Sequence, residues 1–181
     1  KHLTLTILII TLLSLACGGS GSQNQPAAPA ADQPAAESKP AEAPASYTIG
    51  QDVQVGEAKW KILEVKYLGQ ELKSDNEFME PKKTNGNFVL VRLQVENGKT
   101  EAATYAGISL VDDKGRKFER YSEQFGYIPN EEACVLEQLN PNLAKTCSEI
   151  FELPADAKGL KALVGDLEMF GGSEAQVDLG L

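Results

Sequence analysis

The segment at positions 85–98 constrains the fold most, because it reads as one long β-strand between the dipeptides Asn85-Gly86 and Asn97-Gly98. Alternate positions on one of its faces are all aliphatic: Val89, Val91, Leu93 and Val95. The opposite face begins with apolar residues and continues with polar ones: Phe88, Leu90, Arg92, Gln94 and Glu96. An alternation of period two is typical of a strand with one face in a core. The pattern therefore predicts a strand that is buried along one face and covered on the other only over its first half.

Turn signals divide the rest of the chain after position 47 into short alternating segments. Gly56-Glu57 predicts a two-residue type II′ hairpin, a change of phase at Ile62-Leu63 predicts a β-bulge, and the polar stretch 69–84 predicts a long loop. Besides the segment at 85–98, we expect strands at 51–55, 58–68, 105–111, 116–121, 134–139, 145–153, 160–164 and 176–179. No helical period is sustained, so the domain at 47–181 is predicted to be all-β, an antiparallel β-sandwich of about eight strands.

The first residues predict export from the cytoplasm. Lys1-His2 is followed by an almost unbroken apolar run that ends at Leu15. Such a run is too short to span a bilayer comfortably and is typical of a secretory signal peptide, here at 1–16.

The end of this run predicts a lipid anchor. The dipeptide Ala16-Cys17, followed by two glycines, resembles a bacterial lipobox, in which a small residue precedes the cleavage site and the Cys17 thiol takes the lipid. The match departs from the usual pattern at Ser14, where lipoboxes carry Leu. We expect a protein anchored to the outer side of the cell membrane or in the cell envelope, with the Cys17 lipid as its only membrane contact.

Residues 17–46 combine the lipidated cysteine with a stretch rich in Ala, Pro, Gly and Ser that has no large apolar side chain. Nothing in this stretch can offset the entropy lost on ordering, so it predicts a disordered linker. The remaining two cysteines, Cys134 and Cys147, are expected to form a disulfide, because thiols oxidise outside the cytoplasm. A metal site built on two cysteines 13 positions apart with no other soft ligand is the weaker alternative.

Composition excludes several classes of function. The chain carries 17 Lys and Arg against 26 Asp and Glu, and without the residues before Tyr47 these numbers become 15 and 23, a net charge of −8. An acidic domain repels phosphate backbones, so we expect no nucleic-acid partner. The single histidine is His2, inside the predicted signal peptide. Its removal excludes Ser-His-Asp and Cys-His catalysis and His-based zinc sites, and we expect neither an enzyme nor a cofactor.

The pair Asp112-Asp113 precedes Gly115 in a predicted hairpin turn. Adjacent carboxylates could contribute to a calcium site, but calcium takes six to eight oxygen ligands, whereas aspartates at a hairpin tip are typical turn formers. We therefore predict a turn at this position and no metal site.

Three aromatic residues lie close together in the sequence at Tyr121, Phe125 and Tyr127. They lack the strict alternation that would place all three in the core, and one interpretation is a recognition surface with at least two of them exposed. The more usual arrangement for such a segment is that Phe118 and one neighbour pack on the core while the other aromatics cover a sheet edge.

Five segments taken in order resemble the domain-of-unknown-function family 4352: 47–56, 86–97, 110–116, 139–141 and 151–160. Among them are Gly86-Asn87-Phe88-Val89, Leu139-Asn140-Pro141 and Phe151-Glu152-Leu153-Pro154. The resemblance implies a bacterial exported protein, in many cases a lipoprotein, with an immunoglobulin-like sandwich similar to the mycobacterial immunoprotective extracellular protein. The family brings no catalytic motif, so the resemblance implies no site residue.

These observations favour a surface lipoprotein that presents a non-enzymatic binding or interaction module. We expect a monomer whose partner is a protein or an envelope polymer. One alternative is an envelope hydrolase that uses two carboxylates, which predicts a pocket holding both groups. The other is a purely structural role in envelope assembly, which predicts a large apolar surface patch.

Overall fold

A computed structural model describes residues 46–168 and 172–181. The predicted signal peptide, Cys17 and the linker up to position 45 lie outside the described residues, as do positions 169–171. The described residues belong to one compact unit. No helix in the described ranges has the length and apolar character needed to cross a membrane.

The described chain is almost entirely strand and turn. Its strands are β1 (Ser46–Thr48), β2 (Asp52–Val55), β3 (Ala58–Leu72), β4 (Lys82–Asn97), β5 (Ala103–Tyr105), β6 (Ser109–Val111), β7 (Lys117–Phe118), β8 (Glu137–Leu139), β9 (Ala144–Leu153), β10 (Lys161–Gly165) and β11 (Glu174–Asp178). A single 3-10 turn, η1 (Asn130–Glu132), precedes β8.

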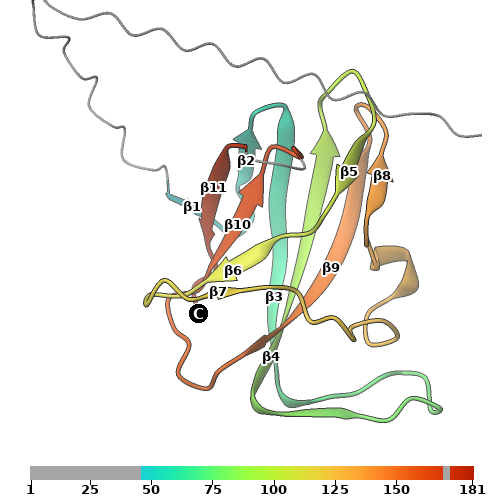
Figure 1. Cartoon of the computed structure of the whole chain (residues 1–181), viewed down its shortest axis with the longest axis vertical. Helices are drawn as coiled ribbons and strands as arrows, with labels where there is room; N and C mark the ends of the chain where they lie inside the picture. Colours follow the sequence, from blue (N-terminus) through green and yellow to red (C-terminus); the bar gives the residue numbers. More distant parts are fainter. Residues whose placement is uncertain (1–45, 169–171) are drawn as a thin grey trace, which may run out of the picture. The chain divides into compact units, whose positions relative to one another are not determined.

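Two sheets pack face to face as a β-sandwich, which confirms the predicted fold class (Figure 1). The first has the order β1-β11-β10-β6-β7, the second has the order β2-β3-β4-β9, and β5 and β8 form a separate two-stranded ribbon. Apolar side chains from both sheets meet in one core, including Ile62 and Val91 from the second sheet and Leu110 and Val164 from the first.

The central strand behaves as its sequence predicts. In β4 the inward residues Val89, Val91, Leu93 and Val95 are all 0% exposed. On the opposite face Phe88 is buried and Gln94 is exposed, because a second and smaller apolar cluster covers only the first half of that face.

The predicted hairpin and bulge before β4 are also present. Gly56 has a φ of +56° and Glu57 has a negative φ, which is the combination that a type II′ turn requires. Ile62 pairs with Leu93 and Glu64 with Arg92, so Leu63 is the extra residue of a bulge in β3.

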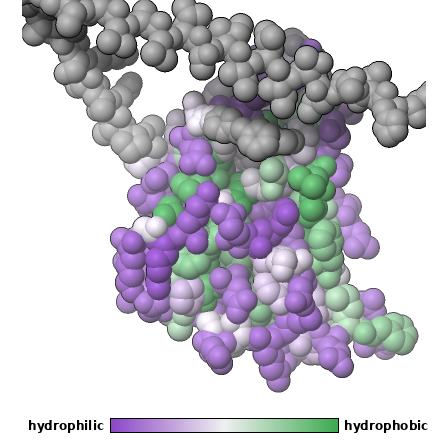
Figure 2. Space-filling view, in the orientation of Figure 1, coloured by the Kyte–Doolittle hydropathy of each residue, from purple (hydrophilic) through white to green (hydrophobic). Residues whose placement is uncertain are grey.

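The predicted loop at 69–84 is too long at both ends. β3 continues to Leu72 and β4 begins at Lys82, so only nine positions separate the two strands. The sequence misled because this part of the hairpin is polar: Glu71, for example, pairs with Lys83 across it. Figure 2 shows hydrophobic surface at its far end, at the lower right. The loop residue Phe78 is 88% exposed.

The predicted hairpin between 134–139 and 145–153 is also wrong in its pairing. β8 pairs with β5, with Thr104 opposite Gln138, and β9 pairs with β4. There are eleven strands in the described ranges rather than about eight, because strands of two or three residues are too short to show an alternation. The sheets are antiparallel except that β1 runs parallel to β11.

The outer edge of β9 is covered by the segment that follows β7. The backbone N–H of Tyr121 donates to the Ile150 carbonyl at 2.7 Å, and the Ile150 N–H donates to Oε1 of the buried Gln124 side chain at 2.8 Å. Arg120 forms an isolated bridge with Phe151. These bonds satisfy backbone groups that an edge strand otherwise leaves unpaired.

Candidate functional site

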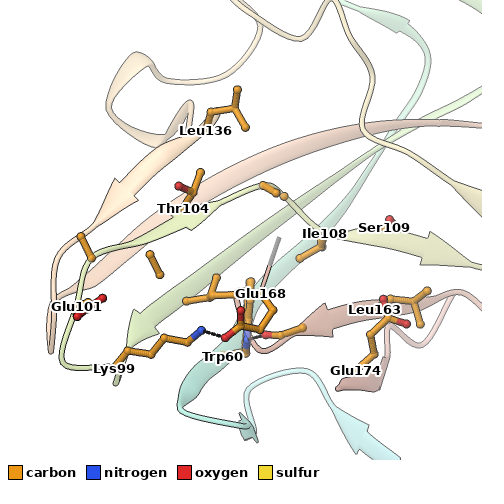
Figure 3. A pocket seen from close by; sticks show the side chains of 16 residues that line it. Trp60, Lys99, Glu101, Thr104, Ile108, Ser109, Leu136, Leu163, Glu168 and Glu174 are labelled. Carbon is orange, nitrogen blue, oxygen red and sulfur yellow. Dashed lines mark hydrogen bonds and ion pairs between the residues drawn. The ribbon is translucent and has the colours of Figure 1, made fainter. Parts of the chain in front are cut away.

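A cleft of about 620 Å³ opens between the β5 segment and the ends of β10 and β11 (Figure 3). We call it the β5–β10 cleft. Its lining comprises Trp60, Lys99, Glu101, Ala102, Ala103, Thr104, Ala106, Gly107, Ile108, Ser109, Leu136, Leu163, Gly165, Leu167, Glu168 and Glu174. A cavity of this size lined by apolar groups and a few polar ones is typical of ligand sites.

The cleft exists because the segment between β5 and β6 does not pair with the end of β10. β10 pairs with β6 only as far as Leu163, opposite Ser109, and then continues for two more residues without a β6 partner. The connection from β5 bends away at Gly107, whose φ is +107°. The next residue, Ile108, donates its N–H to the side-chain Oε2 of Glu149 at 3.2 Å rather than to a backbone carbonyl of a neighbouring strand.

A buried carboxylate lies directly beneath this connection. Glu149 is 0% exposed and accepts hydrogen bonds from the Tyr105 hydroxyl at 2.7 Å and from Arg120 Nη1 at 3.4 Å. A β-carbon added at Gly107 would lie 2.9 Å from Oε1 of Glu149. Only glycine therefore allows the backbone to pass over the carboxylate here, both for its positive φ and for the space.

Burial raises the pKa of Glu149, although hydrogen bonds from Tyr105 and the charge of Arg120 act in the opposite direction. Burial, together with the nearby Glu149 charge, raises the pKa of Tyr105 well above its ordinary value. The Glu149 carboxylate is enclosed and already bonded, so it does not itself face a ligand. It supports the Gly107-Ile108 connection, which lines the cleft.

Trp60 forms another part of the lining. Its indole N–H donates to the Gly165 carbonyl at 2.7 Å, which ties β3 to the end of β10. Its ring centroid lies 6.0 Å from that of Tyr105. The indole is thus fixed between the two sheets and its polar group is satisfied within the protein.

Backbone strain is concentrated at the cleft. Leu136 has a φ of +50° and Leu167 a φ of +62°, and both line the cleft. A bulky side chain rarely adopts this conformation, and strained residues cluster at functional sites. Leu136 is also 67% exposed, so it presents an apolar side chain to solvent beside the opening.

Charges in the lining are mostly negative. Lys99 forms an ion pair with Glu168, drawn as a dashed line in Figure 3. Glu101 and Glu174 have no ion-pair partner within 46–168 and 172–181. The lining therefore has one lysine against three glutamates, a net charge of −2.

The structure joins Cys134 and Cys147 in a disulfide with a Cα–Cα distance of 5.5 Å. Both cysteines are buried in the main core. The bond attaches the segment before β8 to β9, the strand that also carries Glu149. Cys17, the predicted lipid site, lies outside the described residues.

The three aromatics predicted as a recognition surface have different environments. Phe125 is 51% exposed. Tyr121 and Tyr127 are half-buried against the second apolar cluster. The Tyr121 ring packs edge-on against Phe88, with the ring centroids 5.2 Å apart. The Tyr127 hydroxyl donates to the Glu80 carbonyl. The expectation that at least two are exposed is met only at Phe125, because the loop after β3 and the β4 surface cover the tyrosines.

Asp112 acts as the turn former that its sequence context favours. Its side chain accepts hydrogen bonds from the backbone N–H groups of Lys114 and Arg116 and from Nε of Arg116. Gly115 in the same turn has a φ of +74°. Asp113 is exposed, so its carboxylate faces solvent, whereas the Asp112 carboxylate is bonded within the turn.

Sequence reasoning missed the cleft, although one signal pointed to it. The alternation in β9 places Glu149 on the same face as Cys147, Phe151 and Leu153, and that face is buried. A glutamate on a core face needs a partner. The partners, Tyr105 and Arg120, are 44 and 29 positions away, and no local pattern connects them.

Comparisons with known proteins agree with this fold. A family model described as "Domain of unknown function (DUF4352)" matches residues 47–175. No curated protein matches the sequence.

Several solved structures are similar. The yjhA protein of Bacillus subtilis has 13% identity and a TM-score of 0.57, over 74% of this chain and 99% of that one. The ycdA protein of the same species, described as a candidate lipoprotein, has 13% identity and a TM-score of 0.50, over 70% of this chain and 38% of that one. The secreted protein MPT63 of Mycobacterium tuberculosis has 8% identity and a TM-score of 0.47, over 77% and 98%. At identities this low the likeness shows the fold alone.

Proposed function

This chain belongs to the family described as domain of unknown function DUF4352, and from that premise we propose that it is an exported, lipid-anchored β-sandwich that binds a ligand in the β5–β10 cleft without transforming it. The observation that carries the proposal is the cleft itself. It has a volume in the range of ligand sites, and two leucines with strained backbones line it. Rigid sheets hold the connecting segments that line it, as binding loops require.

Export and anchoring are supported by the sequence and by one similar protein. The apolar run at 1–16 and the lipobox-like Ala16-Cys17 predict a signal peptide and a lipid on Cys17. The similar ycdA protein is described as a candidate lipoprotein. In this proposal the membrane contact is the lipid alone, the module is a monomer, and its partner is a protein or an envelope polymer rather than a nucleic acid.

Binding is favoured over catalysis by the state of the carboxylates. Glu149 has a raised pKa, as catalytic acids do, but it is enclosed beneath Gly107. Glu168 is paired with Lys99. The hydrolase alternative would have to rest on Glu101 and Glu174, one acting as an acid and the other as a base or nucleophile.

The test is capture from envelope extracts by residues 41–181, the compact unit that contains both core clusters. Ala102 is exposed in the cleft lining, so Ala102→Trp should block the cleft and abolish capture. Ala155 is exposed in a turn away from the cleft, so Ala155→Trp is the matched control and should capture like the wild type. Equal capture by both variants would contradict the proposed site.

The same extracts test the hydrolase alternative. Incubation of residues 41–181 with envelope polymer should release no soluble fragments above a blank. Release that disappears in the Glu101→Gln and Glu174→Gln variants would replace the binding proposal with a hydrolytic one.

A further inference from the structure

The charges around the β5–β10 cleft are unbalanced in a way that points to its ligand. Lys99 is held by Glu168 and is only 21% exposed in its side chain. Glu101 and Glu174 lie on either side of this pair in Figure 3 and have no ion-pair partner in the described ranges. The opening therefore presents two uncompensated carboxylates and no uncompensated cation.

Part of the cleft lining is apolar. Ile108 is almost fully buried there, Leu163 and Leu167 are half-buried, and the small residues Ala103 and Gly165 leave space between them. An apolar wall binds hydrocarbon or aromatic groups by removing them from water. Binding in this cleft is thus favourable for a ligand with an apolar body.

We propose that the β5–β10 cleft takes an organic cation, a protonated amine or guanidinium carried on an apolar body; this inference rests on the proposed binding function of the same cleft. The apolar body fills the space between Ile108, Leu163 and Leu167, and the cationic group lies at the opening near Glu101 or Glu174. Basic side chains of a protein partner and free amphipathic amines share this chemistry.

Electrostatics also disfavour the other ligand charges. An anionic group at the opening would lie near carboxylates in a chain whose net charge is −9, and like charges at short range oppose binding. A neutral polar group gains no ion pair. A cation gains the pairing with carboxylates and is attracted over a longer range by the acidic domain.

The experiment uses three probes with one apolar body and three charges: 4-phenylbutylamine, 4-phenylbutan-1-ol and 5-phenylpentanoate. Trp60 is the only tryptophan in the chain and its indole N–H bonds to Gly165 in the cleft lining. The indole N–H resonance of residues 41–181 is therefore a single reporter of occupancy. We expect the amine to bind about tenfold more tightly than the alcohol, as one or two partly exposed ion pairs allow, and the pentanoate to bind most weakly.

Matched variants distinguish attraction of the amine by the carboxylates of the cleft from attraction by the net charge of the domain. Glu101→Gln with Glu174→Gln should reduce the affinity for the amine to that for the alcohol. Glu77→Gln with Glu131→Gln makes the same change in net charge at exposed positions outside the cleft and should preserve the preference. An equal loss in both double variants would mean that only the overall charge attracts the amine, which overturns the inference.

The source of the cation is tested with a blocked Phe-Lys dipeptide and its acetyl-lysine counterpart. Tighter binding of the lysine form than of both its acetylated form and the free amine assigns the cleft to a basic segment of a protein. Tighter binding of the free amine than of the lysine form assigns it to a small amine. Equal affinity for amine and alcohol, or no shift of the Trp60 resonance with any probe, overturns the inference. Loss of capture in Ala102→Trp then still supports the proposed function, so the two failures are distinguishable.

Discussion

Glu149 shows at the level of one residue how a charge is kept inside an all-β core. Its two oxygens accept hydrogen bonds from Tyr105, Ile108 and Arg120, so the carboxylate is never left without partners. The same bonds bend the chain between β5 and β6. The charge therefore contributes to the shape of the cleft although it does not face solvent.

The raised pKa of Glu149 has a consequence for stability. The folded state holds the proton more tightly than the unfolded state, so the contribution of this group to the free energy of unfolding falls as pH rises above about 4.5. We expect wild type to lose about 1 kcal/mol or more for each unit of pKa difference, and Glu149→Gln to lack this loss. Urea unfolding followed by Trp60 fluorescence between pH 3 and 7 measures both. Parallel pH profiles of the two proteins would contradict the prediction.

Glu132 should show the opposite dependence. Its hydrogen bonds with Arg92, at 2.6 to 3.0 Å, and with Ser148 hold its pKa below its usual value despite partial burial. A lowered pKa gives stability that is present above about pH 4.5 and is lost as pH falls through the folded pKa. The difference in unfolding free energy between wild type and Glu132→Gln should therefore shrink toward pH 3. A difference that stays constant between pH 3 and 7 would contradict the prediction.

The aromatic residues near β9 can be separated by substitution. Tyr121→Ala should destabilise by about 2 kcal/mol, because the ring packs against Phe88, and Tyr127→Ala by a similar amount. Phe125→Ala should change stability by less than about 1 kcal/mol and lower capture from envelope extracts if the exposed ring contacts the partner. A loss of stability at Phe125 equal to that at Tyr121 would make it structural as well.

Among the elements, the long strands could be predicted from the sequence and the short ones could not. β4 carries four buried aliphatic residues at alternate positions, Val89, Val91, Leu93 and Val95. β3 shows its bulge at Leu63 as a change of phase. β5 and β8 contain three residues each, and their pairing joins positions 34 apart at Thr104 and Gln138. Such pairing depends on tertiary packing, which local patterns do not record.

The cleft was unpredictable for the same reason. Its lining comes from five separate stretches of the chain: Trp60, 99–109, Leu136, 163–168 and Glu174. None of them has a motif, and the unusual conformation of Leu136 and Leu167 is known only once the backbone is traced. The cysteine pair could be inferred because disulfide formation depends on compartment and number more than on fold.

The disulfide is the element-level restraint that fixes the segment before β8. Cys134 and Cys147 are 13 positions apart, so closing this loop should stabilise the domain by roughly 3 kcal/mol. Intact mass of residues 41–181 should be two hydrogens below the reduced form, and reduction should lower the free energy of unfolding by about 2 to 5 kcal/mol. Two thiols that react with a labelling reagent under native conditions would contradict the prediction.

For the whole molecule, the proposed lipid anchor on Cys17 is what would set the place where the module acts. Cys17→Ser removes the thiol that takes the lipid, so we expect an uncleaved precursor that incorporates no labelled fatty acid. Cys134→Ser is the matched control and should be labelled like the wild type. Equal labelling of the Cys17→Ser chain would exclude the proposed anchor.

The covered edge of β9 has a consequence on a crowded surface. Lipid-anchored chains diffuse in two dimensions, where neighbours meet at far higher effective concentration than in free solution. Under these conditions an open strand edge would add a strand from the next molecule and start a growing fibre. At Ile150 the outward N–H and C=O groups are already bonded to Gln124 and Tyr121. At this position β9 should therefore not add a strand from a neighbouring molecule.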